Sequence, residues 1–436
     1  MKSGRNFLAL LMCLVVLGFA WILVVTEESD EQIQKKLIKE ASVLVEDKIY
    51  IRAEPILEEA IECSELLRLD AEQLLKEVYW GLIEEVGYKN KLTALFEKQV
   101  NREGTPTEIY LEAMEYYQGY GMRKKAIEAL RIGYEKTGDP DLLARYEQER
   151  YSFLLGGETY EYVTEVYNDR IQVQKLGEWG LADYYGELII PCQYDKISTF
   201  SAERAVVKDG NEIFSIDEQN HRIYLLKTSV LDFGNYGNDL IGFQTEEGWI
   251  RGTGEFLLGS MTFEELGMYN AGYAAAKYNG KWGVIDTEAE WFIEPVYDEI
   301  LMDTIGRCYE QNAVFACDGN QVYLFVDGQR QDEVYEDAWP FYEQGWAAVK
   351  KNGKWGFIDA AGQVMIDYQY MDARSFSGHL AAVKVEEFWG YISMDNRLVI
   401  DDLYYDVRGF VNGVAAVKNM DGWQFIILDE YREDRL

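Results

Sequence analysis

Tryptophan recurs along the C-terminal two-thirds of the chain at a nearly constant spacing. The positions are Trp179, Trp249, Trp282, Trp355, Trp389 and Trp423, and several are followed directly by glycine. When Ile213 and Tyr323 are placed in the same series, the successive spacings are 34, 36, 33, 41, 32, 34 and 34 residues. A period in this range is typical of a solenoid, a propeller or another array, in which each unit buries its apolar face against its neighbours.

One unit shows what the repeat encodes. Residues 355–358 alternate as a strand, 359–362 contain the Asp and Gly of a tight turn, and 364–366 predict a second strand. Residues 380–385 predict a third strand. We expect Gly356 to permit close backbone approach or a bulge. Three strands cannot bury both faces alone, so the tryptophans are expected to pack against neighbouring units.

The two ends of the repeat segment, 159–436, complement each other. The chain ends with only the first strand of a unit, and residues 160–176 read like the end of one. We therefore predict a propeller-like ring, since closure removes both free edges; the alternative is an open β-superhelix with capped ends. The predicted whole units are 178–210, 211–247, 248–280, 281–319, 320–353, 354–387 and 388–422, with a split unit formed by 423–436 and 159–177.

This region resembles the WG-containing (KWG) repeat family of bacterial proteins. The resemblance is strongest for the units at Lys281, Lys354 and Phe388, whereas the units at Asn211 and Asn320 keep only the strand pattern and the spacing. It implies a non-catalytic repeat domain and brings no active-site residues with it.

The preceding segment, 27–155, has a helical pattern of apolar residues at spacings of three and four. It resembles the tetratricopeptide repeat family through residues in the stretch 110–140, namely Tyr117, Gly121, Ala126, Ala129 and Pro140. The resemblance implies stacked helical hairpins and a protein- or peptide-binding groove. The alternative is a generic helical bundle or stalk.

The N-terminal run Phe7–Val25 contains 19 uncharged residues, which as a helix would span about 28 Å. Lys2 and Arg5 precede it, and acidic residues follow. The positive-inside rule then predicts a single-pass membrane protein, with residues 1–26 as cytoplasmic tip and anchor and the bulk of the chain extracytoplasmic. The alternative is a cleaved signal peptide.

The net charge of −35 excludes the basic footprint that nucleic-acid binding needs. Such acidity fits simple solubility; the more specific interpretation is a cationic partner or loosely held divalent cations. We expect the cysteines to be free thiols, since Cys13, Cys63, Cys192, Cys308 and Cys317 show no CxxC spacing.

The sequence shows no catalytic constellation. Neither His221 nor His379 has a nucleophile or acid at motif spacing, and we interpret His379 as a turn residue. Carboxylates recur at one turn position, at Asp183, Asp217, Asp286, Asp327 and Asp359. Turn capping explains this recurrence better than a ring of metal sites, because no contiguous calcium loop occurs. We therefore expect no catalytic, metal-binding or cofactor-binding residues and no cofactor.

Five aromatic residues fall outside the repeated tryptophan position and are the candidate binding residues: Trp291, Trp339, Phe341, Tyr342 and Trp346. Exposed rings of this kind stack on sugars or anchor peptides, although large aromatics more often fill space in a core.

The sequence thus predicts a multidomain α plus β protein: one N-terminal transmembrane helix, tetratricopeptide-like helical hairpins, and an all-β repeat domain. We expect a non-enzymatic, membrane-anchored scaffold for an unknown protein or peptide partner on the extracytoplasmic side. One alternative is a module that binds cell-wall polysaccharide. A second is a hydrolase that uses a pair of carboxylates.

Overall fold

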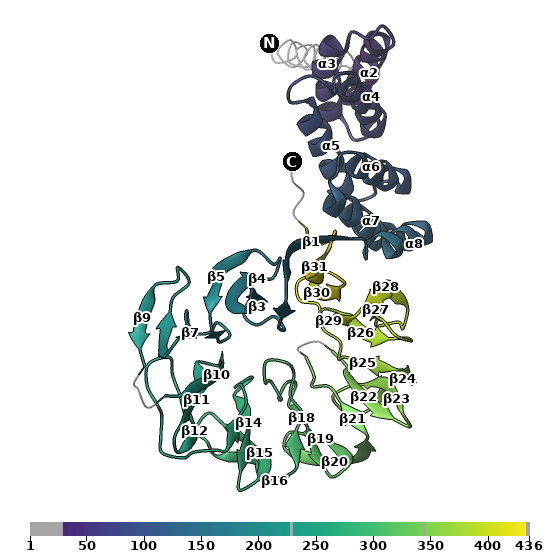
Figure 1. Cartoon of the computed structure of the whole chain (residues 1–436). Coiled ribbons are helices and arrows are strands. Elements are labelled where there is room, and N and C mark those ends of the chain that lie inside the picture. Colours follow the sequence, from purple (N-terminus) through teal and green to yellow (C-terminus); the bar gives the residue numbers. More distant parts are fainter. Residues whose placement is uncertain (1–28, 227–229, 343–344, 433–436) are drawn as a thin grey trace, which may run out of the picture. The chain divides into compact units, whose positions relative to one another are not determined.

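The computed structural model describes residues 29–226, 230–342 and 345–432 (Figure 1). The chain divides into two compact units, with the boundary between Tyr146 and Glu147. Each unit has its own hydrophobic core.

The first unit is helical. Its described helices are α2 (Asp30–Glu46), α3 (Tyr50–Cys63), α4 (Arg68–Gly81), α5 (Tyr88–Asn101), α6 (Thr107–Gly119), α7 (Arg123–Thr137) and α8 (Pro140–Glu149). Helix α2 begins at Ser29, whose hydroxyl accepts a hydrogen bond from the Gln32 amide, as expected of an N-cap. Helix α7 ends at Gly138, which has a φ of 70° and caps the last turn.

Small and aromatic side chains share the helical core. Ala126 and Ala129 are almost fully buried, and so is Tyr117. Beside this apolar core, the fully buried carboxylate of Glu72 accepts hydrogen bonds of 2.7 and 2.8 Å from Arg102 and one of 2.8 Å from Gln99. The buried charge is therefore paired, as buried charges in proteins usually are.

The expected membrane anchor needs correction. In the part of the chain that the structure describes, no helix combines the length and the apolar character needed to cross a bilayer. This contradicts the prediction of a fold with a single transmembrane helix, and with it the predicted single-pass localisation and extracytoplasmic bulk. The apolar run 7–25 and Cys13 lie outside the described residues. The prediction rested on the hydropathy and length of this run and on the charges that flank it.

The described residues of the second unit form eight antiparallel sheets, the blades of a β-propeller (Figure 1). Blade 1 comprises β2 (Tyr162–Val163), β3 (Arg170–Lys175), β4 (Glu178–Asp183) and β5 (Leu188–Tyr194), and blade 2 comprises β6 (Lys196–Ile197), β7 (Ala205–Asp209), β8 (Glu212–Ile216) and β9 (Arg222–Leu225). Blade 3 comprises β10 (Asp232–Gly237), β11 (Leu240–Thr245) and β12 (Gly248–Gly252). Blade 4 comprises β13 (Glu265–Leu266), β14 (Tyr273–Tyr278), β15 (Lys281–Asp286) and β16 (Trp291–Tyr297).

Blade 5 comprises β17 (Glu299–Ile300), β18 (Ala313–Asp318), β19 (Gln321–Val326) and β20 (Gln329–Tyr335), and blade 6 comprises β21 (Asp337–Ala338), β22 (Ala347–Lys351), β23 (Lys354–Ile358) and β24 (Val364–Tyr370). Blade 7 comprises β25 (Asp372–Ala373), β26 (Leu380–Lys384), β27 (Trp389–Ser393) and β28 (Leu398–Tyr404). Blade 8 comprises β29 (Asp406–Val407), β30 (Val414–Asn419), β31 (Gly422–Leu428) and β1 (Phe153–Tyr160). The predicted propeller is confirmed.

Blade 8 closes the ring with strands from both ends of the unit. Strand β1 pairs antiparallel with β31, so that Leu155 lies opposite Ile426 and Tyr160 opposite Trp423. The residues 171–174, expected to belong to the split unit, instead lie in β3 of blade 1. The closing strand therefore starts a few residues before the segment that the sequence pattern indicated. Because both edges are paired, an open superhelix is excluded.

The Trp-Gly pair has two separate structural roles. Each repeated tryptophan packs between blades: Trp355 of blade 6, for example, clusters with Ala381 and Val383 of blade 7. The glycine lies where β23 and β24 change register, and a Cβ on Gly356 would be 2.7 Å from the Ile366 carbonyl oxygen. The expected bulge with close backbone approach is confirmed, and it explains why glycine follows tryptophan.

Candidate functional site

Each blade has an inner loop, which we define as the segment between its first and second strands. In blade 1 this loop ends in a two-residue turn, where Asn168 and Asp169 have φ values of 48° and 56° and Tyr167 and Arg170 exchange two backbone hydrogen bonds. Positive φ at both central residues is typical of type I′ turns. Turns with the same pair of positive φ values occur at 202–203, 238–239, 271–272, 311–312, 378–379 and 412–413.

A buried side chain lies at the same repeat position of every blade and anchors the described turns to the framework. It is aromatic in seven blades: Phe200, Tyr236, Tyr269, Tyr309, Phe341, Phe376 and Phe410. In blade 1 the equivalent residue is Val166, which is also buried. The turn residues that follow are therefore held in fixed positions by the core, although most of them face solvent.

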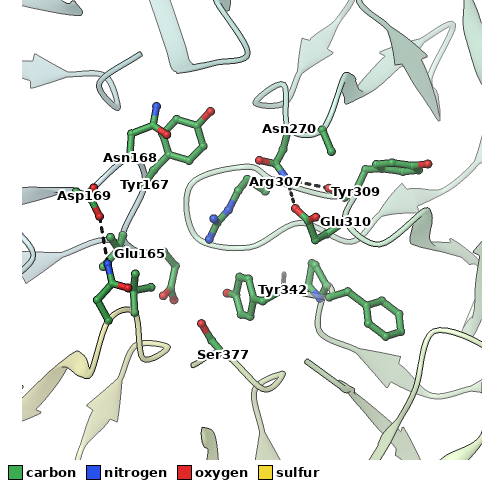
Figure 2. A pocket seen from close by; sticks show the side chains of 16 residues that line it. Glu165, Tyr167, Asn168, Asp169, Asn270, Arg307, Tyr309, Glu310, Tyr342 and Ser377 are labelled. Carbon is green, nitrogen blue, oxygen red and sulfur yellow. Dashed lines mark hydrogen bonds between the residues drawn. The ribbon is translucent and has the colours of Figure 1, made fainter. Parts of the chain in front are cut away.

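The inner loops of six blades surround one cavity of about 560 Å³, which we call the central cavity. Its lining includes residues 165–169 of blade 1, 270–271 of blade 4, Arg307, Tyr309 and Glu310 of blade 5, 340–342 of blade 6, Ser377 of blade 7 and 411–412 of blade 8. Figure 2 shows these side chains converging from different blades. A volume of this size lies within the range of small-molecule sites, about 300–1,000 Å³.

Glu165 is the least expected residue of the central cavity. The residue before the buried anchor is uncharged in the other blades: Thr199, Asn235, Met268, Cys308, Pro340, Ser375 and Gly409. Glu165 is only 3% exposed. Its Oε2 accepts a 3.1 Å hydrogen bond from the Gly409 amide, but its Oε1 has no hydrogen-bond partner among the residues that the structure describes.

The nearest cation does not satisfy this oxygen. Arg408 Nε lies 3.9 Å from Glu165 Oε1, which is too long for a hydrogen bond. The guanidinium instead donates to the carbonyl oxygens of Val163 and Val407, both at 3.0 Å. Burial raises the pKa of Glu165, and Arg408 offsets this effect only in part. A buried, incompletely paired acid with a perturbed pKa is typical of functional sites.

Arg307 contributes a positive charge to the same cavity. Its Nε donates a 2.6 Å hydrogen bond to Asp303, and the guanidinium lies over the ring of Tyr342 at 5.1 Å. Burial raises the pKa of Tyr342 well above its ordinary value, so its hydroxyl stays protonated. The Arg307 charge is therefore largely balanced by Asp303, whose side chain is fully buried.

Two further carboxylates belong to the lining. Glu310 accepts a 2.8 Å hydrogen bond from Asn270 and is partly exposed. Asp169 is exposed, and Asn412 Nδ2 lies 3.4 Å from its Oδ1. Acidic groups thus outnumber basic ones in the lining of the central cavity.

The five candidate aromatics are not brought together as one surface. Trp291 lies in blade 4 and packs edge-on against Phe263. Trp339 and Trp346 are partly buried against the core between blades 6 and 7. Phe341 stacks on Phe315, and the Tyr342 hydroxyl accepts a hydrogen bond of 2.9 Å from Trp339. Of the five, Phe341 and Tyr342 line the central cavity.

The repeated aspartates are turn caps, as expected. Oδ1 of Asp359 accepts hydrogen bonds from the amides of Ala361 and Gln363, at 3.0 and 2.8 Å. Asp183, Asp217 and Asp286 make the same pair of bonds, whereas the Asp327 side chain accepts no such bonds from the described residues. Among the described residues, no group of His, Cys, Asp and Glu side chains is arranged to hold a metal ion.

Other predicted side chains lie away from the cavity lining. His379 is an exposed turn residue with a φ of 65°, as the repeat pattern predicted. His221 is exposed and pairs with Asp217 at 3.2 Å. Cys63, Cys192, Cys308 and Cys317 are free thiols, which confirms the expectation for the described cysteines.

The helical unit has a smaller hollow of about 360 Å³, lined by residues of α4, α5 and α6. Trp80 is 45% exposed there and meets Tyr116 edge-on, with ring centroids 5.6 Å apart. On its other side the nearly buried Lys76 pairs with Glu112. The hollow therefore combines an exposed aromatic ring with paired charges.

The sequence analysis missed Glu165, Arg307 and Glu310. A usable signal was present: when the units are aligned on the buried loop anchor, a single glutamate occupies a position that is otherwise uncharged.

The profile of the WG containing repeat matches residues 179–212, 248–282, 282–303, 334–355, 355–387 and 389–423. The C-terminal unit therefore carries WG repeats. The gaps between matches include Ile213 and Tyr323, which replace the repeated tryptophan. No curated protein matches this sequence.

Several solved structures share a similar arrangement at low identity. PorZ of the type-IX secretion system of Porphyromonas gingivalis is 9% identical, with a TM-score of 0.33; the match covers 61% of this chain and 42% of PorZ. A eukaryotic initiation factor is 10% identical, with a TM-score of 0.37 and coverage of 63% and 84%. Hsv2 of Kluyveromyces lactis is 12% identical, with a TM-score of 0.32 and coverage of 62% and 97%. This chain thus spans less than half the length of PorZ.

Proposed function

We propose that this chain is a non-enzymatic interaction scaffold and that its propeller binds a partner through the central cavity. The observation that carries the proposal is the buried carboxylate of Glu165, which lines the cavity and has one oxygen with no hydrogen-bond donor in the described part of the chain. A framework of repeats supports the inner loops, and Glu165 departs from the repeat pattern within one of these loops. Such a rigid framework with variable loops is typical of binding proteins.

The test is site-specific photo-crosslinking in the full-length chain. A photoreactive residue replaces Asn168, which is exposed and lines the central cavity. As a control it replaces Gln219, which is exposed in an outer turn of blade 2 and is not part of the lining. We expect a defined adduct from position 168 and none from position 219. Equal labelling from both positions, or none from position 168, would contradict the proposal.

We further propose that the helical unit is tetratricopeptide-like and that its hollow binds an extended peptide. The exposed ring of Trp80 beside Tyr116 favours this function, because half-exposed aromatic residues are common binding anchors. Trp80→Ala should abolish capture of a peptide selected on residues 29–146. Capture that survives this change would exclude the hollow as the binding site.

The two alternative functions have less support. Polysaccharide binding rests on the five off-pattern aromatics, three of which do not line the central cavity. Binding of a soluble wall glycan that is lost in Tyr342→Ala would favour it. A hydrolase would require turnover that disappears when Glu165 or Glu310 is replaced by its amide, since two acids share this cavity.

A further inference from the structure

We propose that the central cavity recognises a cationic nitrogen group, a primary ammonium or a guanidinium, and that Glu165 is the counter-ion for it. This inference rests on the proposed function, because it names the chemistry that the same cavity selects. The ligand can be a lysine or arginine side chain of a partner protein or a free amine, and both present the same group to the site.

The first argument is the unsatisfied oxygen of Glu165. A carboxylate that is 3% exposed normally uses both oxygens in hydrogen bonds. Here Oε2 is bonded to the Gly409 amide, whereas Oε1 has no donor within the described residues. Arg408 does not supply one, because its guanidinium donates to the carbonyl oxygens of Val163 and Val407 and its Nε lies 3.9 Å from Oε1. A bound N–H group would supply the missing donor, and its positive charge would balance the buried acid.

The second argument is the charge of the surrounding lining. Glu310 and Asp169 belong to the same cavity, and Arg307 is the cation among its lining residues. Since Arg307 is paired with Asp303 at 2.6 Å, it does not balance Glu310 or Asp169, and Arg408 at 3.9 Å balances Glu165 only in part. An anionic ligand would therefore meet net repulsion, whereas a cation would be attracted on entry and within the cavity. The chain's net charge of −35 adds attraction at longer range.

The third argument is the shape and surface of the site. Tyr167, Tyr309 and Tyr342 line the cavity together with Asn168 and Asn270 (Figure 2). Aromatic faces attract cations, and they also pack against the aliphatic part of a lysine or arginine side chain. Asp169 is exposed and Glu165 is buried, so carboxylates occur both at the surface and inside. A long basic side chain matches this distribution better than a compact metal ion.

The probes are N-acetyl-lysine methylamide and N-acetyl-arginine methylamide, with n-butylamine as the free amine. The neutral control is N-acetyl-norleucine methylamide, which keeps the lysine stem but lacks the ammonium. Binding to the full-length wild-type protein is measured by calorimetry and by ligand-observed NMR at low salt. We expect at least one cationic probe to bind at least tenfold more tightly than the norleucine compound. Equal binding of the neutral and cationic probes would overturn the inference without the use of any variant.

Two variants locate the interaction. Glu165→Gln keeps the side-chain shape and an acceptor for the Gly409 amide but removes the charge. We expect at least a tenfold loss of affinity for the cationic probe. The matched control is Glu203→Gln, in the equivalent turn of blade 2, which is exposed and does not line the cavity. It should leave affinity unchanged. Unchanged binding in a folded Glu165→Gln protein, or an equal loss in both variants, would contradict the inference.

The two proposals fail in different ways. If cationic probes do not bind but photo-crosslinking from position 168 still yields a partner, the scaffold function stands and the cation inference is wrong. If the probes bind and depend on Glu165 but no protein is crosslinked, the inference stands and the protein-interaction function is wrong. Binding of n-butylamine as tight as that of the capped lysine would identify a free amine as a sufficient ligand.

Discussion

The Glu165 carboxylate accepts one hydrogen bond from a backbone amide and interacts electrostatically with several charged neighbours. These neighbours are Arg408, Arg374 and Arg307, which favour the ionised form, and Asp303, which disfavours it. Burial has the largest effect and raises the pKa of Glu165. In the absence of ligand, the ionised form is therefore less favourable in the folded protein than in the unfolded chain.

We predict that Glu165→Gln stabilises the ligand-free protein, and does so more at pH 8 than at pH 5. The folded pKa is raised, so as pH increases the unfolded chain releases this proton first and the wild type loses stability up to the raised pKa. The gain should be about 1–3 kcal/mol in the free energy of unfolding, as expected for removing an unsatisfied buried group.

Thermal unfolding of both proteins at several pH values measures this effect. A variant that is less stable than wild type at pH 8 would show that Glu165 has a structural role instead. Stability lost at a binding residue is common, since binding sites are rarely optimised for folding.

The glycine after the repeated tryptophan allows a second residue-scale prediction. Gly356→Ala should destabilise the propeller by about 1–3 kcal/mol, because its Cβ would meet the Ile366 carbonyl oxygen at 2.7 Å. Gly156→Ala in β1 is the control, since its nearest contact would be an ordinary 3.8 Å. Denaturant titration compares the two. A loss in Gly156→Ala equal to that in Gly356→Ala would argue against the steric explanation.

Single residues were predictable only where the repeat specifies them. The role of Gly356 and the caps made by Asp359 follow from local backbone geometry, which sequence encodes directly. Glu165 and Arg307 are far apart in the chain and share a cavity only because the ring brings blades 1 and 5 together. Without the ring geometry, nothing distinguishes these two residues from the many other charged residues.

At the scale of elements, closure depends on β1. This strand covers the outer edge of β31, and it contributes Tyr160, which is 1% exposed and donates a 2.8 Å hydrogen bond to the Gly186 carbonyl oxygen. Without β1, β31 would present unpaired backbone groups to solvent. An unprotected edge of this kind favours association with other chains.

A pair of fragments tests the importance of this strand. Fragment 147–432 contains β1, whereas fragment 161–432 lacks it. We expect the shorter fragment to unfold at a lower temperature and to associate as its concentration increases. Scanning calorimetry and sedimentation velocity measure the two effects. Identical melting and sedimentation of both fragments would show that β1 is dispensable for closure.

Strands and turns were largely predictable from alternation and from the repeated Asp and Gly residues. The inner loops were not, because their first strands have only two residues, as in β6 and β25. Such short strands leave no periodic pattern. Pairing with the neighbouring strand defines them, and this pairing is a property of the assembled blade.

At the scale of the whole molecule, the two units have separate cores. The helical core includes the buried ion pair of Glu72 with Arg102, and the propeller cores lie between blades. We predict two unfolding transitions in calorimetry. Glu72→Ala should lower the free energy of unfolding of the helical unit by about 3–5 kcal/mol, because it leaves Arg102 without its partner. Only the transition of the helical unit should then move to a lower temperature. Gly356→Ala should lower only the other.

Glu77→Ala provides the control for the helical unit, since Glu77 is an exposed residue on the same helix as Glu72. It should shift neither transition measurably. A single transition that moves equally in Glu72→Ala and Gly356→Ala would mean that the two units unfold together.

The sequence indicated the change from helical to β-rich segments, since this change in periodicity is local. It also predicted a membrane-spanning fold, which the described helices contradict.

The origin of blade 8 has a consequence for the order of events during synthesis. The ribosome makes Phe153–Tyr160 before any other propeller strand and makes its partner, Gly422–Leu428, after all the others. The ring therefore cannot close until Gly422–Leu428 has been made, and the nascent chain carries an unpaired apolar strand while the remaining blades form. A chain released early keeps this open edge, so truncated products should be recognised and degraded more readily than the finished protein.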